Sequence, residues 1–211
     1  MPRNLNLVFF QILFSATTWC NGNTVDGIDI KRFVTKGEKI WTLYSNYSDG
    51  KTCVNDRVTW IHRDYVTLNR TYIKDSQQSS FIIQGKFLRH GPMFEYDTLE
   101  STKKGNKYTR ESVKYQDPNN TCAVFKVYYL RSNAVDGPSG PTFLGLYGRQ
   151  IISPRLYVPV FPTVLSVTVE LRVKQSVLSL LDVRNITNCD MEFDKYKAGE
   201  KKTISTKNCL S

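Results

Sequence analysis

The segment Thr121-Cys-Ala-Val-Phe-Lys-Val127 follows the turn signal Asp117-Pro-Asn-Asn120 and continues into Tyr128-Tyr-Leu130. Its β-branched and aromatic residues predict a strand over 122–130. Similar runs, bounded by Gly, Pro, Asn or Asp, recur at roughly 8–12-residue spacing on either side. We expect these strands at 39–46, 57–61, 65–73, 81–88, 93–97, 107–115 and 167–173.

Short strands separated by turn signals are typical of an antiparallel sandwich or barrel. The chain has 211 residues, enough for one well-buried domain. A helix is expected at 190–198, because Met191, Phe193 and Tyr196 have helical spacing and Gly199 follows as a stop signal.

The first twenty residues resemble a secretory signal peptide rather than part of the domain. Arg3 gives a basic start, Leu5 to Phe14 is an apolar run, and small and polar residues lead to a cut after Cys20. No later segment reaches ~18 unbroken apolar residues, so no membrane anchor is expected. We therefore predict a secreted, extracellular domain over 21–211.

Cysteine number agrees with secretion. Removal of Cys20 leaves four cysteines, which predicts two disulfides in an oxidising compartment with three connectivities open. No CxxC pair exists and the chain has only two histidines, so neither a metal nor another cofactor is expected. Four glycosylation sequons follow in the mature chain, at Asn46, Asn69, Asn119 and Asn185.

The formal net charge is +10, or +9 once Arg3 leaves with the signal peptide. The basic residues are scattered, which favours solubility over a dedicated polyanion site. We expect a monomer that binds neither nucleic acid nor membrane. The chain contains no GxSxG, HExxH or Walker motif, so an enzyme is not expected.

Residues 133–166 interrupt the strand pattern. They hold five of the eight prolines and only three charged residues. Proline excludes a central strand, and the apolar content is too high for a solvated linker. Two explanations stay open: an insertion at one end of the barrel, or a retained intron or assembly artefact.

Segments in a particular order connect the chain to a known family. They are Ile40-Trp-Thr-Leu-Tyr44, Leu68-Asn-Arg-Thr-Tyr72, Thr121-Cys-Ala-Val-Phe-Lys-Val127, Glu170-Leu-Arg-Val173, Asn188-Cys-Asp-Met-Glu-Phe-Asp-Lys-Tyr196 and Lys207-Asn-Cys-Leu210. Together they resemble the tick salivary lipocalins of the histamine-binding family, over about 31–132 and from 167 onward. The resemblance implies an all-β, eight-stranded antiparallel lipocalin barrel with a C-terminal α-helix packed outside. It also implies the disulfides Cys53–Cys209 and Cys122–Cys189, and it leaves 133–166 without a counterpart.

The same resemblance implies an amine pocket, which needs carboxylates and aromatic faces. The aromatic positions of the family fall on Tyr44, Phe94, Tyr96 and Tyr108, and the acidic positions fall on Glu111 and Glu170. An acid that the family carries after the first strand is replaced here by Tyr47, and Asp49 belongs to a turn signal.

Two interpretations compete at these positions. Each aromatic residue could equally be ordinary barrel core. Alternation over 167–173 predicts a buried valine face with Glu170 exposed, whereas the resemblance directs Glu170 into the cavity.

The expected function is to bind and sequester a small host mediator, histamine or serotonin, and so to suppress host inflammatory defence. Two alternatives are open. One is a scavenger of a lipid mediator such as a leukotriene or fatty acid, and the other is an antagonist of a host defence protein such as complement.

Overall fold

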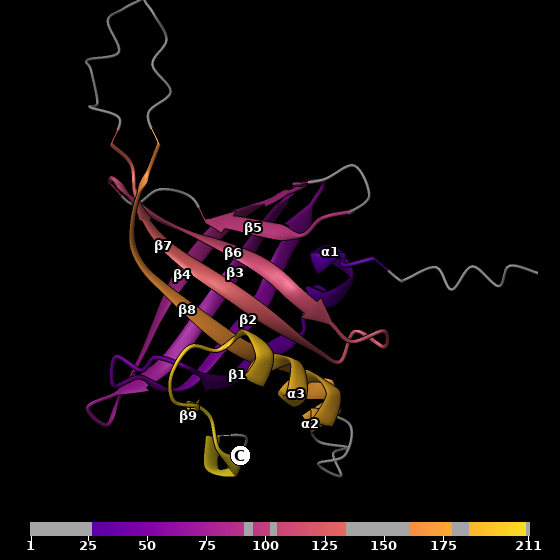
Figure 1. The fold of residues 1–211 in the computed structure, drawn as a ribbon, viewed down its shortest axis with the longest axis vertical. Coiled ribbons are helices and arrows are strands. Elements are labelled where there is room, and N and C mark those ends of the chain that lie inside the picture. The colour runs from indigo at the N-terminus through magenta and orange to yellow at the C-terminus, as the bar shows by residue number, and fades with distance from the viewer. Residues whose placement is uncertain (1–26, 91–94, 102–104, 134–160, 179–185, 210–211) are drawn as a thin grey trace, which may run out of the picture.

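A computed structural model describes residues 27–90, 95–101, 105–133, 161–178 and 186–209. Eight antiparallel strands follow one another around a closed barrel, and β1 (Lys39–Ser45) completes it by pairing with both β8 (Thr163–Lys174) and β2 (Thr52–His62) (Figure 1). A C-terminal helix packs on the outside. The predicted fold class, an eight-stranded antiparallel barrel with a C-terminal helix packed outside, is confirmed.

The strands lie close to their predicted positions. Their bounds are β1 Lys39–Ser45, β2 Thr52–His62, β3 Tyr65–Lys74, β4 Gln77–Leu88, β5 Thr98–Ser101, β6 Lys107–Gln116, β7 Cys122–Arg131 and β8 Thr163–Lys174. A two-residue strand, β9 Lys202–Thr203, adds to β1. β8 begins at Thr163, so residues 163–166 belong to the barrel and not to the atypical segment.

The prediction of a strand at 93–97 was wrong in position. The fifth strand is Thr98–Ser101, and it pairs with residues Gly85 to Leu88 of β4. Its position is fixed by Leu99, which is buried in the barrel core opposite Phe87. A methyl group on Gly85 would lie 2.6 Å from Leu99 Cδ1, so a larger residue there would force the Leu99 side chain to move.

One end of the barrel is filled with apolar side chains. The short helix α1, Ile30–Phe33, places two fully buried residues against the inner faces of the strands. Phe33 packs on Phe125, with ring centroids 5.8 Å apart. We refer to this filled region as the closed end.

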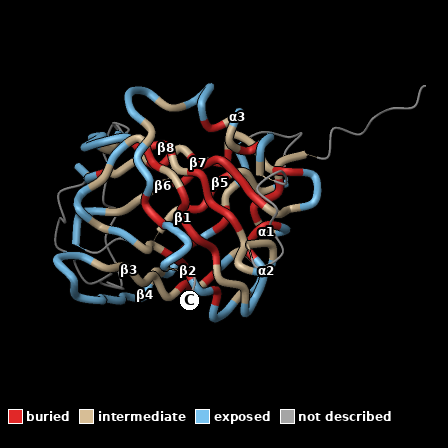
Figure 2. Tube along the Cα trace, turned by 90° about the horizontal axis from the view of Figure 1, so that it is seen from below, coloured by how far each residue is buried: buried red, intermediate tan, exposed pale blue. Residues whose placement is uncertain are grey.

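A second apolar cluster lies on the outside of the barrel. Helix α3, Thr187–Tyr196, buries Phe193 against Val169, Leu171 and other outward residues of β7 and β8. The disulfide Cys122–Cys189 attaches this helix to β7, and Cys53–Cys209 attaches the C-terminus to β2, which is the connectivity that the resemblance implies. Buried residues accordingly gather along β1, β7 and β8, while β3 and β4 are more exposed (Figure 2).

The signal-peptide prediction and most of 133–166 lie outside the described residues. Among the described helices, none is both long and apolar enough to cross a membrane.

Candidate functional site

A cavity of about 310 Å³ opens at the end of the barrel opposite α1. Its walls are inward-facing residues of β3, β4, β7 and β8, among them Tyr72, Phe81 and Tyr129. Tyr47, Asp49 and Lys51 of the β1–β2 loop also line it, and Lys51 pairs with Asp49 at 2.5 Å. We call this space the open-end cavity.

Beneath the cavity lies a cluster of five charged side chains that point into the barrel. Arg70 donates two hydrogen bonds of 2.7 Å to Asp56. Arg172 donates to Glu111 at 2.5 Å and to Glu170 at 2.6 and 2.8 Å. We refer to Asp56, Arg70, Glu111, Glu170 and Arg172 as the ion cluster.

The free-energy cost of burying the charges of the ion cluster is offset by the ion pairs among them. Burial alone would raise the pKa of Asp56, but the charge and hydrogen bonds of Arg70 outweigh it and lower that pKa. Burial would lower the pKa of Arg172, and the charges of Glu111 and Glu170 raise it instead. Three carboxylates paired with two guanidiniums give the cluster a formal charge of −1.

Glu170 and Thr168 line the open-end cavity, and each has a side-chain oxygen without a hydrogen-bond partner among the described residues. Both hydrogen bonds from Arg172 reach Oε2 of Glu170, and none of the described residues donates to Oε1. The hydroxyl of Thr168, two residues earlier on the same face of β8, is buried and has no hydrogen-bond partner within the described part of the chain. A buried hydroxyl without a partner costs free energy, which a polar ligand group would recover.

A second cavity, of about 600 Å³, adjoins the first in the barrel wall. It shares Phe81, Ile83 and Tyr129 with the open-end cavity. It is also lined by Ile82 and Tyr108, which are on the outer faces of β4 and β6. Together the two cavities form a slot with both polar and apolar walls that runs from the ion cluster to the surface.

The structure brings Glu111 and Glu170 together inside the barrel. The expectation from alternation, that Glu170 is exposed, was wrong. On the valine face of β8, Val169, Leu171 and Val173 are buried, but in the outer cluster with Phe193 of α3, whereas Val167 is 39% exposed. Glu170 and Arg172 therefore occupy the inner face of the barrel.

The predicted aromatic residues are not brought together. Tyr44 lies on the outer face, where its ring is 6.3 Å from that of Phe193, because a bulge between Thr42 and Tyr44 shifts the register of β1. Tyr96 lies at the closed end and donates a 2.5 Å hydrogen bond to Asp64. Tyr108 lines only the second cavity, and Phe94 is outside the described residues.

Sequence reasoning missed both arginines of the ion cluster, together with Asp56 and Thr168. A signal was present for Arg70, since it shares a period-two face with the apolar Val66 and Leu68. Arg172 gave no such signal, because the other face of β8 is the apolar one.

The described sequons differ in their surroundings. The Asn46 side chain is used by the fold, donating to the Ala198 carbonyl at 3.0 Å and accepting from the Val169 amide at 2.8 Å. Asn69 lies on the outer face of β3, and Asn119 is exposed in the β6–β7 turn. Asn185 is outside the described residues. Glycosylation of all four remains a prediction.

Comparison with known proteins gives structural likenesses only. No protein-family profile matches the chain, and no curated protein sequence matches it. A solved structure of Japanin from Rhipicephalus appendiculatus bound to cholesterol aligns with a TM-score of 0.46 and 12% identity, over 83% of this chain and 97% of that one. The siderocalin Ex-FABP, described as having dual ligand specificities, aligns with a TM-score of 0.35 and 11% identity, over 67% and 69%.

Proposed function

We propose that this chain is a secreted lipocalin that binds and sequesters a small host mediator, a biogenic amine such as histamine or serotonin, and thereby suppresses host inflammatory defence. The observation that carries the proposal is the formal charge of −1 on the ion cluster beneath the open-end cavity. A monocation bound there makes the buried charge zero, whereas an anion makes it −2. In a low-dielectric interior this difference favours the cation.

The site also offers the contacts that an aromatic amine needs. Glu170 and Thr168 both line the cavity, and under this proposal Glu170 Oε1 accepts from the ammonium and the Thr168 hydroxyl bonds a second polar group. Tyr72, Phe81 and Tyr129 supply aromatic surface in the same cavity. Glu111 contributes indirectly, because it holds Arg172 and so fixes the orientation of the Glu170–Arg172 pair.

Substitution Glu170→Gln tests the proposal, with Glu100→Gln as the matched control. Glu100 pairs with Arg110 at 2.7 Å on the outer face of the barrel, much as Glu170 pairs with Arg172 inside. Calorimetric titration with histamine and serotonin should show about tenfold weaker binding for Glu170→Gln, the rough scale of one charge-assisted contact. Glu100→Gln should bind like the unsubstituted protein. Equal affinity in Glu170→Gln would reject the amine site.

A lipid mediator is the second candidate, and a specific observation favours it. The open-end cavity and the second cavity share apolar walls, so the slot is longer than a small amine requires. A hydrocarbon chain would occupy it while an acidic headgroup met Lys51 at the mouth. Binding of a leukotriene or fatty acid that is insensitive to Glu170→Gln would support this candidate against the first.

A further inference from the structure

The seam between β1 and β2 is only partly closed by those two strands. They pair where Lys39, Ile40 and Trp41 meet Arg57, Asp56 and Asn55, although both strands continue toward the open end. Beyond that point Tyr44 and Ser45 pair with Thr203 and Lys202 of β9 instead. The barrel wall beside the open-end cavity is therefore completed by the C-terminal segment.

Ile204 bridges the two strands directly. Its amide donates to the Leu43 carbonyl of β1 at 2.9 Å, and its carbonyl accepts from the Cys53 amide of β2 at 2.8 Å. Its side chain is 6% exposed and lines the open-end cavity. One residue of the C-terminal segment is thus both a backbone link across the seam and part of the cavity wall.

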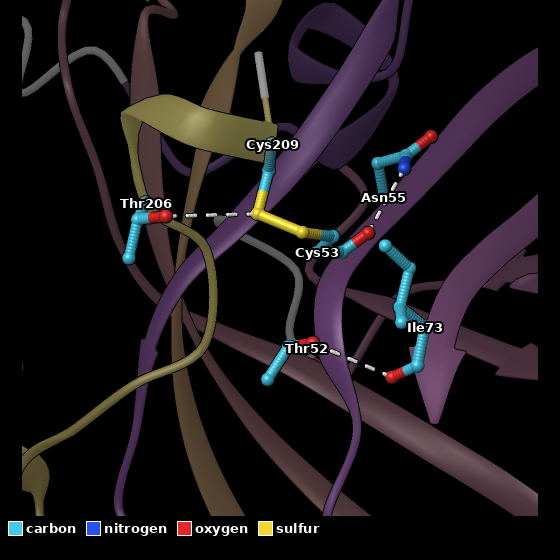
Figure 3. Close-up of a disulfide and its surroundings, with 6 residues drawn as sticks. All are labelled: Thr52, Cys53, Asn55, Ile73, Thr206 and Cys209. Atoms are coloured by element: carbon cyan, nitrogen blue, oxygen red, sulfur yellow. Dashed lines mark hydrogen bonds between the residues drawn. A yellow bond between two sulfur atoms is a disulfide. The ribbon is translucent and has the colours of Figure 1, made fainter. Parts of the chain in front are cut away.

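The segment is fastened at both ends. Lys201 forms an ion pair with Asp190 of α3 and lies 4.1 Å above the ring of Tyr44. At the other end Cys209 is bonded to Cys53, next to the seam, with Thr206 beside the sulfur (Figure 3). We call residues 201–209 the strap.

We propose that the strap is a functional wall of the binding site, in which the Cys53–Cys209 bridge holds Ile204 in place and Ile204 controls how long a ligand stays bound. The claim about ligands rests on the proposed function, in that it needs the open-end cavity to be the binding site. The claim about the seam does not. Release of the strap exposes the Leu43 carbonyl and the Cys53 amide and opens the cavity sideways between β1 and β2.

The seam is tested by hydrogen exchange on two disulfide variants. In Cys53→Ser/Cys209→Ser, the amides of residues 53 and 204 should lose protection, because the hydrogen bonds that Ile204 makes to β1 and β2 are no longer held. Cys122→Ser/Cys189→Ser is the control for loosening of α3, since that bridge ties α3 to β7 and reaches the strap only indirectly, through the Lys201–Asp190 ion pair. Unchanged protection in the first variant, or equal loss in both, overturns the proposal.

The cavity wall is tested with Ile204→Ala, and Ile40→Ala is the matched control. Ile40 is likewise a buried isoleucine beside the seam between β1 and β2, 4% exposed, but it belongs to β1 and lies in the core of the closed end. The probe is N-phenyl-1-naphthylamine, a neutral apolar fluorophore whose binding does not depend on an amine site. Its dissociation rate should rise about tenfold in Ile204→Ala and in the strap-release variant, and stay within about twofold in Ile40→Ala.

A similar rise in Ile40→Ala would mean general loosening and would overturn the role of Ile204, as would a failure of the unsubstituted protein to bind the probe. If the probe behaves as expected but no amine binds, the proposed function fails and the strap inference stands. If amines bind but dissociate from Ile204→Ala at the same rate as from the unsubstituted protein, the proposed function stands and the strap inference fails.

Discussion

Five charged residues lie inside the barrel beneath the open-end cavity. Arg172 is 4% exposed and joins Glu111 and Glu170, while Arg70 joins Asp56 and approaches Glu111 at 3.6 Å. Each ion has lost most of its hydration, so each depends on its partners. The family resemblance predicted the two glutamates of this cluster. It did not predict that both would be paired with arginines, because that pairing depends on how three strands, β3, β6 and β8, are placed around the barrel.

Arg172→Met should therefore be costly, because it leaves Glu111 and Glu170 buried beside each other without their cation. We expect the free energy of unfolding to fall by about 3–5 kcal/mol, the range for a broken buried ion pair. Arg110→Met removes the partner of Glu100 on the outer face and should cost no more than about 1 kcal/mol. Urea unfolding of both variants measures the contrast, and equal losses would refute the interpretation of the cluster as buried and interdependent.

Tyr129 lines the open-end cavity and has a raised pKa. Burial, and then the charge of Glu170, raises the pKa of Tyr129 to about 12. A group whose pKa is higher in the folded state contributes stability that is full below its unfolded pKa of about 10 and is lost as the pH rises toward the folded value.

The unsubstituted protein should therefore lose up to about 2–3 kcal/mol of stability between pH 10 and 12 from this group. Tyr129→Phe should lack that part of the loss. The free energy of unfolding of both proteins is measured at several pH values across this range. If it falls equally in both, Tyr129 is solvated and the prediction is wrong.

At the scale of elements, most strands could be predicted because turn residues mark their ends. The exceptions have physical reasons. A bulge adds one residue to β1 within the continuous run Trp41-Thr-Leu-Tyr44, and nothing in such a run reveals on which side Tyr44 will lie. In β8, Val169, Leu171 and Val173 are buried as alternation predicts, but alternation cannot tell the inside of a barrel from an outer face that a helix covers.

The packing of α3 on the outside of the barrel can be tested at two residues of the helix. Phe193 is fully buried between α3 and the outer faces of β7 and β8, while Met191 of the same helix is 54% exposed. Phe193→Ala should lower the free energy of unfolding by about 3–5 kcal/mol, and Met191→Ala should change it by less than about 0.5 kcal/mol. Because α3 lies outside the barrel, ligand affinity at the cavity should be unaltered in both. A large loss of affinity in folded Phe193→Ala would mean that the helix shapes the cavity.

At the scale of the molecule, the interior of the barrel consists of two regions, a packed closed end and an open end with a cavity. The closed end, with α1 and Phe33, is packed without space for a ligand, and the open end keeps a cavity above the ion cluster. The barrel, its external helix and its disulfide pairing followed from the family resemblance. The C-terminal strap could not be predicted, because its role depends on where β1 and β2 separate.

The most direct test of the whole account is a titration of the unsubstituted, disulfide-bonded protein against histamine, serotonin and a leukotriene in one buffer. The negative formal charge of the ion cluster predicts that an amine binds with a dissociation constant below ~10 μM, roughly 7 kcal/mol or more of binding free energy, and that the leukotriene binds more weakly. Leukotriene binding that is tighter than that of both amines, or no binding of any of the three, would contradict the assignment of the cavity as an amine site.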